Sequence, residues 1–127
     1  MDEKLALTMQ DVLEAYGALS ELVSRYKSEL PVAASLRVAR LTRQLRAEVG
    51  VYRAERDRLV QLHGAEDEEG KITVQAGTAA HLAFAADERE LLAQEIRLPI
   101  EPLGLEELGL ERIDADVVVG LMPVLGE

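Results

Sequence analysis

Apolar side chains recur every three or four residues through most of the first 63 residues. This spacing puts them on one face of a helix and predicts two long amphipathic helices. The first is expected from about residue 3 to residue 29. Thr8 and Asp11 are alternative N-caps, so its start could lie one turn later. Pro31 cannot continue a helix interior but suits a first helical turn, so we expect it to separate the two helices.

The second predicted helix spans residues 32–63. Gly64 follows it as a stop signal, and Gly50 interrupts it, which indicates a close helix contact or a bend. At 1.5 Å per residue the helix is about 45 Å long, more than one small core covers, so we expect another subunit to cover part of its apolar stripe. That stripe consists of Val38, Leu41, Leu45, Val49, Tyr52, Leu59 and Leu62.

Short elements are expected after the two long helices. A charged turn at residues 66–71 leads to an alternating strand at 72–75, and a third helix is expected over 79–95. Residues 96–100 alternate in polarity beside prolines, so they are expected to be extended. They could pair with residues 72–75 as a minor sheet.

A short last helix is expected over residues 117–125, with Asp114 or Asp116 as its cap and its apolar tail docked on the core. The whole pattern predicts a mainly α protein with one domain over residues 1–127. Its parts are a long antiparallel αα-hairpin at 1–64 and a smaller C-terminal α+β cap at 65–127, with at most a two-stranded sheet.

Composition narrows the function classes. The chain is 48% hydrophobic and 30% charged, which is enough for a packed core. It has no Cys, which excludes disulfides and thiolate zinc sites. A net charge of −10 argues against general binding of nucleic acids or anionic membranes. Neither a signal-peptide pattern nor a membrane-spanning run is apparent, so a cytoplasmic location is expected.

The charge is unevenly distributed along the chain. Residues 36–58 carry seven Arg against three acids, whereas residues 59–127 carry fifteen acids against four bases. One interpretation is that the arginine-rich helix binds an anion, such as a nucleotide, a phosphate or an acidic partner, because guanidinium groups bind these bidentately. The other is that these arginines are solvated and pair with the acidic C-terminal half. Steps of three residues rotate successive arginines by about 60°, which spreads them round the helix and favours the second interpretation within one subunit. An oligomer could bring equivalent arginines together.

The candidate ligand-binding residues are those of this helix. Tyr52 lies between arginines and could stack on a base, although its place on the apolar face also suits core packing. The full set is Arg37, Arg40, Arg43, Arg46, Tyr52, Arg53 and Arg56.

Catalytic motifs are not apparent. His63 and His81 are the only histidines and stand outside any metal motif, and the acidic run at 66–69 lacks the ligand spacing of an EF-hand. No catalytic residue, metal or cofactor is therefore expected, and the chain is not expected to be an enzyme. The paired acids Asp87-Glu88 and Glu106-Glu107 leave one alternative, a metal-dependent hydrolase that uses Asp87, Glu88 or Glu90.

The order of several short motifs resembles small proteins of unknown function from tailed phages and prophages. The motifs are the Leu-Pro-Val turn, the ERDRLVQLHG helix end, the DEEGK turn, the LLAQEIRLPIEPLGLEEL stretch and the final IDADVVVGLMP segment. The resemblance implies a viral accessory or virion-assembly protein that works in a bacterial cytoplasm. It implies no residue-level function.

Together these features predict a phage-encoded, non-enzymatic binding protein that acts as a helical homo-oligomer. Its expected role is anti-defence, either by sequestering a host nucleotide signal or by blocking a host protein. The alternative is a virion structural or assembly adaptor or chaperone, whose apolar stripe packs on another viral protein.

Overall fold

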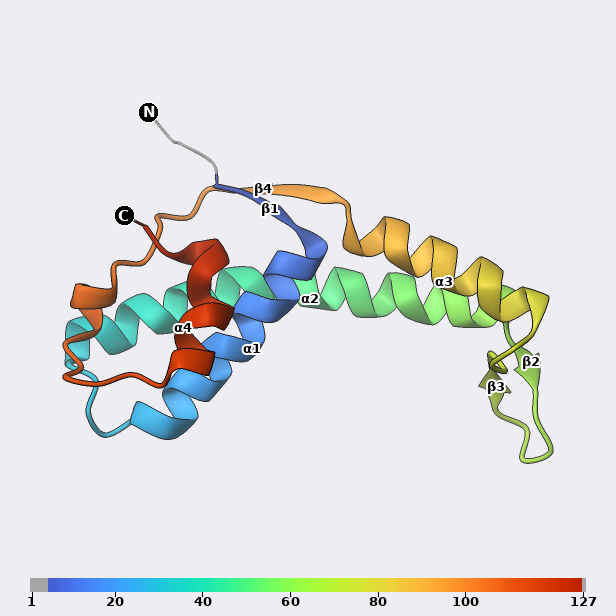
Figure 1. Ribbon diagram of the computed structural model, residues 1–127, viewed down its shortest axis with the longest axis horizontal. Coiled ribbons are helices and arrows are strands. Elements are labelled where there is room, and N and C mark those ends of the chain that lie inside the picture. The colour runs from blue at the N-terminus through green and yellow to red at the C-terminus, as the bar shows by residue number, and fades with distance from the viewer. Residues whose placement is uncertain (1–4, 127) are drawn as a thin grey trace.

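The computed structural model describes residues 5–126 and is mainly helical (Figure 1). The helices are α1 (Met9–Tyr26), α2 (Val32–His63), α3 (Ala79–Leu92) and α4 (Ala115–Leu121), with 3-10 turns η1 (Leu105–Leu108) and η2 (Met122–Val124). The strands are β1 (Leu5–Thr8), β2 (Ala65–Glu66), β3 (Ile72–Thr73) and β4 (Glu95–Leu98). The predicted mainly α class, with two long helices joined by a turn, is confirmed.

The first helix starts later than the earlier of the two predicted positions. The backbone N–H of Asp11 donates to the Thr8 hydroxyl (3.1 Å), and the Thr8 N–H donates to the Asp11 carboxylate (3.0 Å). This reciprocal cap fixes the start of α1 at Met9. The preceding residues 5–8 form a strand, which corrects the predicted helix over that stretch, and residues 3–4 lie outside the described residues. At its other end α1 stops at Tyr26 and not at residue 29.

The second helix has the predicted bounds. Gly64 is its C-cap, in an extended conformation. A Cβ on Gly64 would meet the Val60 carbonyl oxygen and lie 2.6 Å from Ile72 Cγ2, so glycine is needed because β3 passes so close. Gly50 does not mark a close helix contact, which was one of its two predicted explanations, because a Cβ there would meet nothing within 4 Å.

The predicted pairing of residues 72–75 with 96–100 was wrong. Two separate antiparallel two-stranded sheets form instead, β1 with β4 and β2 with β3. In the first, Leu5 pairs with Leu98 and Thr8 with Glu95. The reason is that α3 ends at Leu92 and carries the chain back along α2 to the start of α1, which places β4 beside β1 and leaves β3 at the far end of α2 (Figure 1).

The C-terminal segment docks on α1, as expected for an apolar tail. The last helix is displaced from the predicted 117–125, because α4 ends at Leu121 and Pro123 lies in the following 3-10 turn. Asp114 is the N-cap residue but makes no side-chain cap bond. The tail is held by backbone bonds from Leu103 N to Val124 O (2.7 Å) and from Gly126 N to Leu103 O (2.8 Å).

The molecule has a well-packed head and a thin arm. We define the head as residues 5–52 with 95–126, and the arm as residues 53–94, which contain the last part of α2, the β2–β3 hairpin and α3. Every residue of the buried core cluster lies in the head. The cluster is contributed by β1, α1, α2, α4, η2 and the segment after β4. In the arm only Leu59 and Phe84 are buried hydrophobics, within the described residues. Figure 1 shows the arm extending away from the head along α2. Across residues 5–126, no helix has the length and apolarity to cross a membrane.

Candidate functional site

The first part of α2 presents a groove lined by arginines. Arg37, Arg40, Arg43 and Gln44 face Pro99, Ile100 and Glu101, and together they enclose about 490 Å³. The extended segment after β4 forms the opposite wall, because Pro99 and Pro102 keep it out of a helix. A volume of this size falls in the range of small-molecule sites.

Arg37 fixes that wall to α2. Its Nη2 donates to the backbone oxygens of Glu101 (2.8 Å) and Pro102 (2.9 Å), and its Nε lies 3.4 Å from the Glu107 carboxylate. The Glu101 carboxylate is more distant at 3.9 Å. Arg37 is therefore largely engaged in shaping the groove, and its charge is compensated by two acids.

The charges of Arg40 and Arg43, unlike that of Arg37, are not compensated by an ion pair within the described residues. Both side chains are exposed, and within residues 5–126 neither takes part in an ion pair. Since Glu101 stands at the Arg37 end, the positive potential is concentrated at the Arg40 and Arg43 end. This arrangement favours a compact anion there.

The other predicted ligand-binding residues lie elsewhere. Arg46 and Arg53 are exposed and do not line this groove. Tyr52 is half-buried and packs against the core cluster. Arg56 lies in the arm, where its Nε donates to Glu88 (2.8 Å) and its guanidinium carbon lies 5.5 Å from the centre of the Phe84 ring. The structure thus brings together three of the seven predicted residues.

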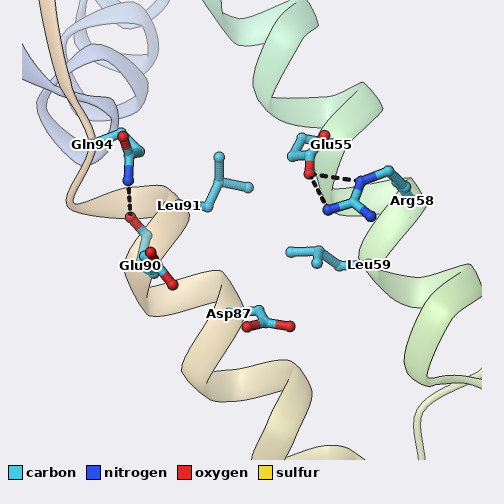
Figure 2. A pocket seen from close by; sticks show the side chains of 7 residues that line it. All are labelled: Glu55, Arg58, Leu59, Asp87, Glu90, Leu91 and Gln94. Atoms are coloured by element: carbon cyan, nitrogen blue, oxygen red, sulfur yellow. Dashed lines mark hydrogen bonds and ion pairs between the residues drawn. The ribbon is translucent and has the colours of Figure 1, made fainter.

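A second groove lies between α2 and α3, shown in Figure 2. It encloses about 320 Å³ and is lined by Glu55, Arg58, Leu59, Asp87, Glu90, Leu91 and Gln94. The Arg58 guanidinium hydrogen-bonds Glu55 (2.7 Å), which lowers the pKa of Glu55 and raises that of Arg58. Asp87 and Glu90 project from α3 on the opposite side.

Asp87 and Glu88, two of the acids considered for a hydrolase, and Glu107 of the second acidic pair contact basic side chains. Asp87 contacts His63, Glu88 contacts Arg56, and Glu107 contacts Arg37. Across the described residues 5–126, no group of three or more His, Asp or Glu side chains is arranged to hold a metal ion.

Sequence reasoning missed the contact between His63 and Asp87. The imidazole Nε2 lies 2.7 Å from the Asp87 carboxylate, and the ring meets Phe84 edge-on with centroids 6.4 Å apart. The available signal was spacing, because His63 follows Leu59 by four residues and so shares its face of α2. The contact joins the end of α2 to the middle of α3.

Comparison with known proteins adds nothing to this geometry: no family model, curated protein or solved structure matches the chain.

Proposed function

We propose that this chain is a non-enzymatic binding protein that holds a small phosphate-bearing anion in the arginine groove of α2. The observation that carries the proposal is the pair Arg40 and Arg43, exposed at one end of a groove and free of ion pairs within residues 5–126. Guanidinium groups bind phosphate oxygens through two parallel hydrogen bonds, so two of them at one site suit a nucleotide or inorganic phosphate.

The surroundings favour a nucleotide over bare phosphate. Pro99 offers an exposed apolar surface on the opposite wall, and Gln44 offers both a donor and an acceptor. A phosphate at Arg40 and Arg43 avoids Glu101, and a sugar or base has room beside the wall. The chain's net charge of −10 weakens the long-range attraction of an anion, so affinity depends on these local contacts.

In biological terms, the protein is a phage accessory protein that sequesters a host nucleotide signal. The motif order described above supports a phage origin, and a binding site without a metal cluster in the described residues supports retention over turnover. The alternative is a virion assembly adaptor. It is supported by exposed large apolar side chains such as Val32, Leu82 and Val119.

Isothermal titration calorimetry with inorganic phosphate, AMP and ATP tests whether the groove binds an anion. Replacing Arg40 with Ala is expected to weaken nucleotide binding about 10-fold or more, because charged hydrogen bonds are lost. Arg46→Ala is the matched control: it removes the same charge from an exposed position of the same helix outside the groove. Equal loss in both variants, or no binding of any of the three probes by the wild-type protein, would overturn the proposal.

The fate of the nucleotide separates the remaining hypotheses. Incubation with Mg²⁺ or Mn²⁺ is expected to return the nucleotide intact. Turnover that depends on Asp87 or Glu90 would instead establish the hydrolase alternative. Presence of the protein in purified virions would favour the adaptor.

A further inference from the structure

Glu101 brings a carboxylate to the arginine groove from the wall that faces α2. Its side chain is 90% exposed, and its ion-pair contact among the described residues, with Arg37, is 3.9 Å long and so exceeds hydrogen-bond distance. The backbone of Glu101, in contrast, is fixed, because its carbonyl oxygen accepts a hydrogen bond of 2.8 Å from Arg37. The groove therefore contains a carboxylate whose base is held in place and whose oxygens are open to a ligand.

The wall runs antiparallel to α2. Glu101 contacts Arg37 in the second turn of the helix. Further along the same segment, a Cβ on Gly109 would lie 2.9 Å from Pro31, which directly precedes α2. The chain therefore passes from Pro99 to Glu101 in the direction of the start of α2. This order places Glu101 level with Arg37, and Pro99 further toward the middle of the helix.

A phosphate held by Arg40 and Arg43 would leave Glu101 close to the part of the ligand that adjoins the phosphate. Along the axis of α2, Arg40 lies about 4.5 Å from Arg37, and Arg43 about 9 Å. An ionised carboxylate only accepts hydrogen bonds, so it repels a second phosphate and binds hydroxyl groups. In a nucleoside 5′-phosphate the group that adjoins the phosphate is the ribose, whose 2′- and 3′-hydroxyls can donate. The exposed ring of Pro99 is then available to the base.

We propose that Glu101 accepts hydrogen bonds from the ribose 2′- and 3′-hydroxyls of the bound nucleotide and makes the groove selective for ribonucleotides. The inference rests on the proposed function, because it takes the phosphate to be held by Arg40 and Arg43. Glu101 then has two effects: it stabilises the sugar, and it disfavours an anion at the Arg37 end of the groove. A phosphate-bearing ligand without these hydroxyls loses the first effect and is still subject to the second.

Isothermal titration calorimetry with AMP and 2′,3′-dideoxy-AMP tests the sugar contact. The two ligands carry the same base and the same phosphate, so the ratio of their affinities reports on the hydroxyls. The wild-type protein is expected to bind AMP about 5-fold more tightly or better, because hydrogen bonds to a charged group are stronger than neutral ones. Glu101→Ala is expected to make the two affinities equal. Glu101→Gln is expected to keep part of the preference, because its amide oxygen still accepts.

Inorganic phosphate separates the charge of Glu101 from its hydrogen bonds. Glu101→Ala and Glu101→Gln are both expected to bind phosphate about 2-fold more tightly or better than the wild-type protein, because a nearby negative charge is removed. Tighter phosphate binding combined with a lost AMP preference is not the behaviour of a damaged groove. Alanine also keeps the Glu101 backbone oxygen that holds Arg37. Glu106→Ala is the matched control, because it removes an exposed acid of the same segment outside the groove lining.

The ribose contact and the anion groove fail separately. If the wild-type protein binds phosphate in an Arg40-dependent way but binds AMP and 2′,3′-dideoxy-AMP equally, the ribose contact is wrong and the proposed function stands. Equal loss of the AMP preference in Glu101→Ala and Glu106→Ala would also overturn the ribose contact. Absence of binding of all these anions would overturn the proposed function and the ribose contact with it.

Discussion

Leu45 and Leu59 lie on the same side of α2 about four turns apart, yet their surroundings differ. Leu45 belongs to the core cluster of the head, where α1 and α4 also contribute fully buried side chains. Leu59 is 4% exposed but is not part of that cluster, and α3 is the long element beside it. α2 therefore runs from a core built by several elements in the head to a contact with α3 in the arm.

The contacts that hold the arm are correspondingly polar. Arg56 pairs with Glu88 and stacks on Phe84, and His63 contacts Asp87. Ion pairs of partly exposed groups contribute only about 0–1 kcal/mol each. The head can fold on its apolar burial, whereas the arm depends on α2 being anchored in the head. Regions with few buried apolar contacts open locally at low free energy.

The largest difference between head and arm is expected when the same substitution, Leu to Ala, is made once in each region. Leu45→Ala is expected to destabilise the protein by about 3–5 kcal/mol, because it leaves a cavity in a closed core. Leu59→Ala is expected to cost about 2 kcal/mol or less, because the thin arm can collapse around the lost side chain. Urea unfolding measures both values, and hydrogen exchange locates the loss.

In Leu59→Ala the faster hydrogen exchange should be confined to α3 and the end of α2. In Leu45→Ala hydrogen exchange should become faster in both the head and the arm. Equal losses of stability would mean that head and arm unfold as one unit.

Two glycines at close contacts, one in the head and one in the arm, test the same difference in packing. In the head, a Cβ on Gly120 would lie 2.7 Å from the Cβ of Ala18, between α4 and α1. Gly120→Ala is therefore expected to cost about 1–3 kcal/mol, by forcing the two helices apart. In the arm, Gly64→Ala is expected to displace the β2–β3 hairpin with a global loss below about 1 kcal/mol, since few buried contacts depend on it.

Gly17→Ala serves as the control for both, because a Cβ there meets nothing. It is expected to stabilise α1 by about 0.5–1 kcal/mol through helix propensity. Thermal unfolding ranks the three variants, and a larger loss for Gly64→Ala than for Gly120→Ala would contradict the assignment of the core to the head.

Local sequence signals predicted the bounds of the helices better than they predicted which strands pair. The bounds of α2 follow from Pro31 and Gly64, which act on the adjacent backbone, and the later start of α1 follows from the Thr8–Asp11 cap. Strand pairing depended on where α3 returns the chain. Since that is a tertiary property, the predicted pairing of residues 72–75 with residues 96–100 was wrong: β3 pairs with β2, and β4 pairs with β1.

The candidate site shows the same division. The arginine-rich segment was evident from charge alone, but the choice among its residues was not. Arg37, Arg40 and Arg43 became a groove only because the segment after β4 lies against them. Arg56 was equally basic in sequence, and its role followed from Glu88 and Phe84 on another helix.

The smallest expected effects come from replacing one surface arginine that forms ion pairs in each region. In the head, Arg25 of α1 donates to Asp114 and Asp116 at the start of α4, both at 3.0 Å, and its hydrogen bond lowers the pKa of Asp116 below the ordinary 3.8. In the arm, Arg58 lowers the pKa of Glu55 below the ordinary 4.5. A lowered carboxyl pKa adds stability above the unfolded-state value, and this stability is lost as pH falls through the folded-state pKa.

Arg25→Gln should therefore lower the thermal midpoint at pH 7, with the difference from wild type shrinking as the pH falls below about 4. Arg58→Gln should produce a smaller change with the same pH dependence, because Glu55 and Arg58 lie on one helix and join no separate elements. NMR titration of the carboxyl groups checks the cause, since each variant should return its own partner's pKa to the ordinary value. If the midpoint difference for Arg25→Gln persisted at pH 3, its source would be packing of the guanidinium stem and not its charge. The proposed difference in stabilisation between ion pairs that join α1 to α4 and an ion pair within α2 would then be wrong.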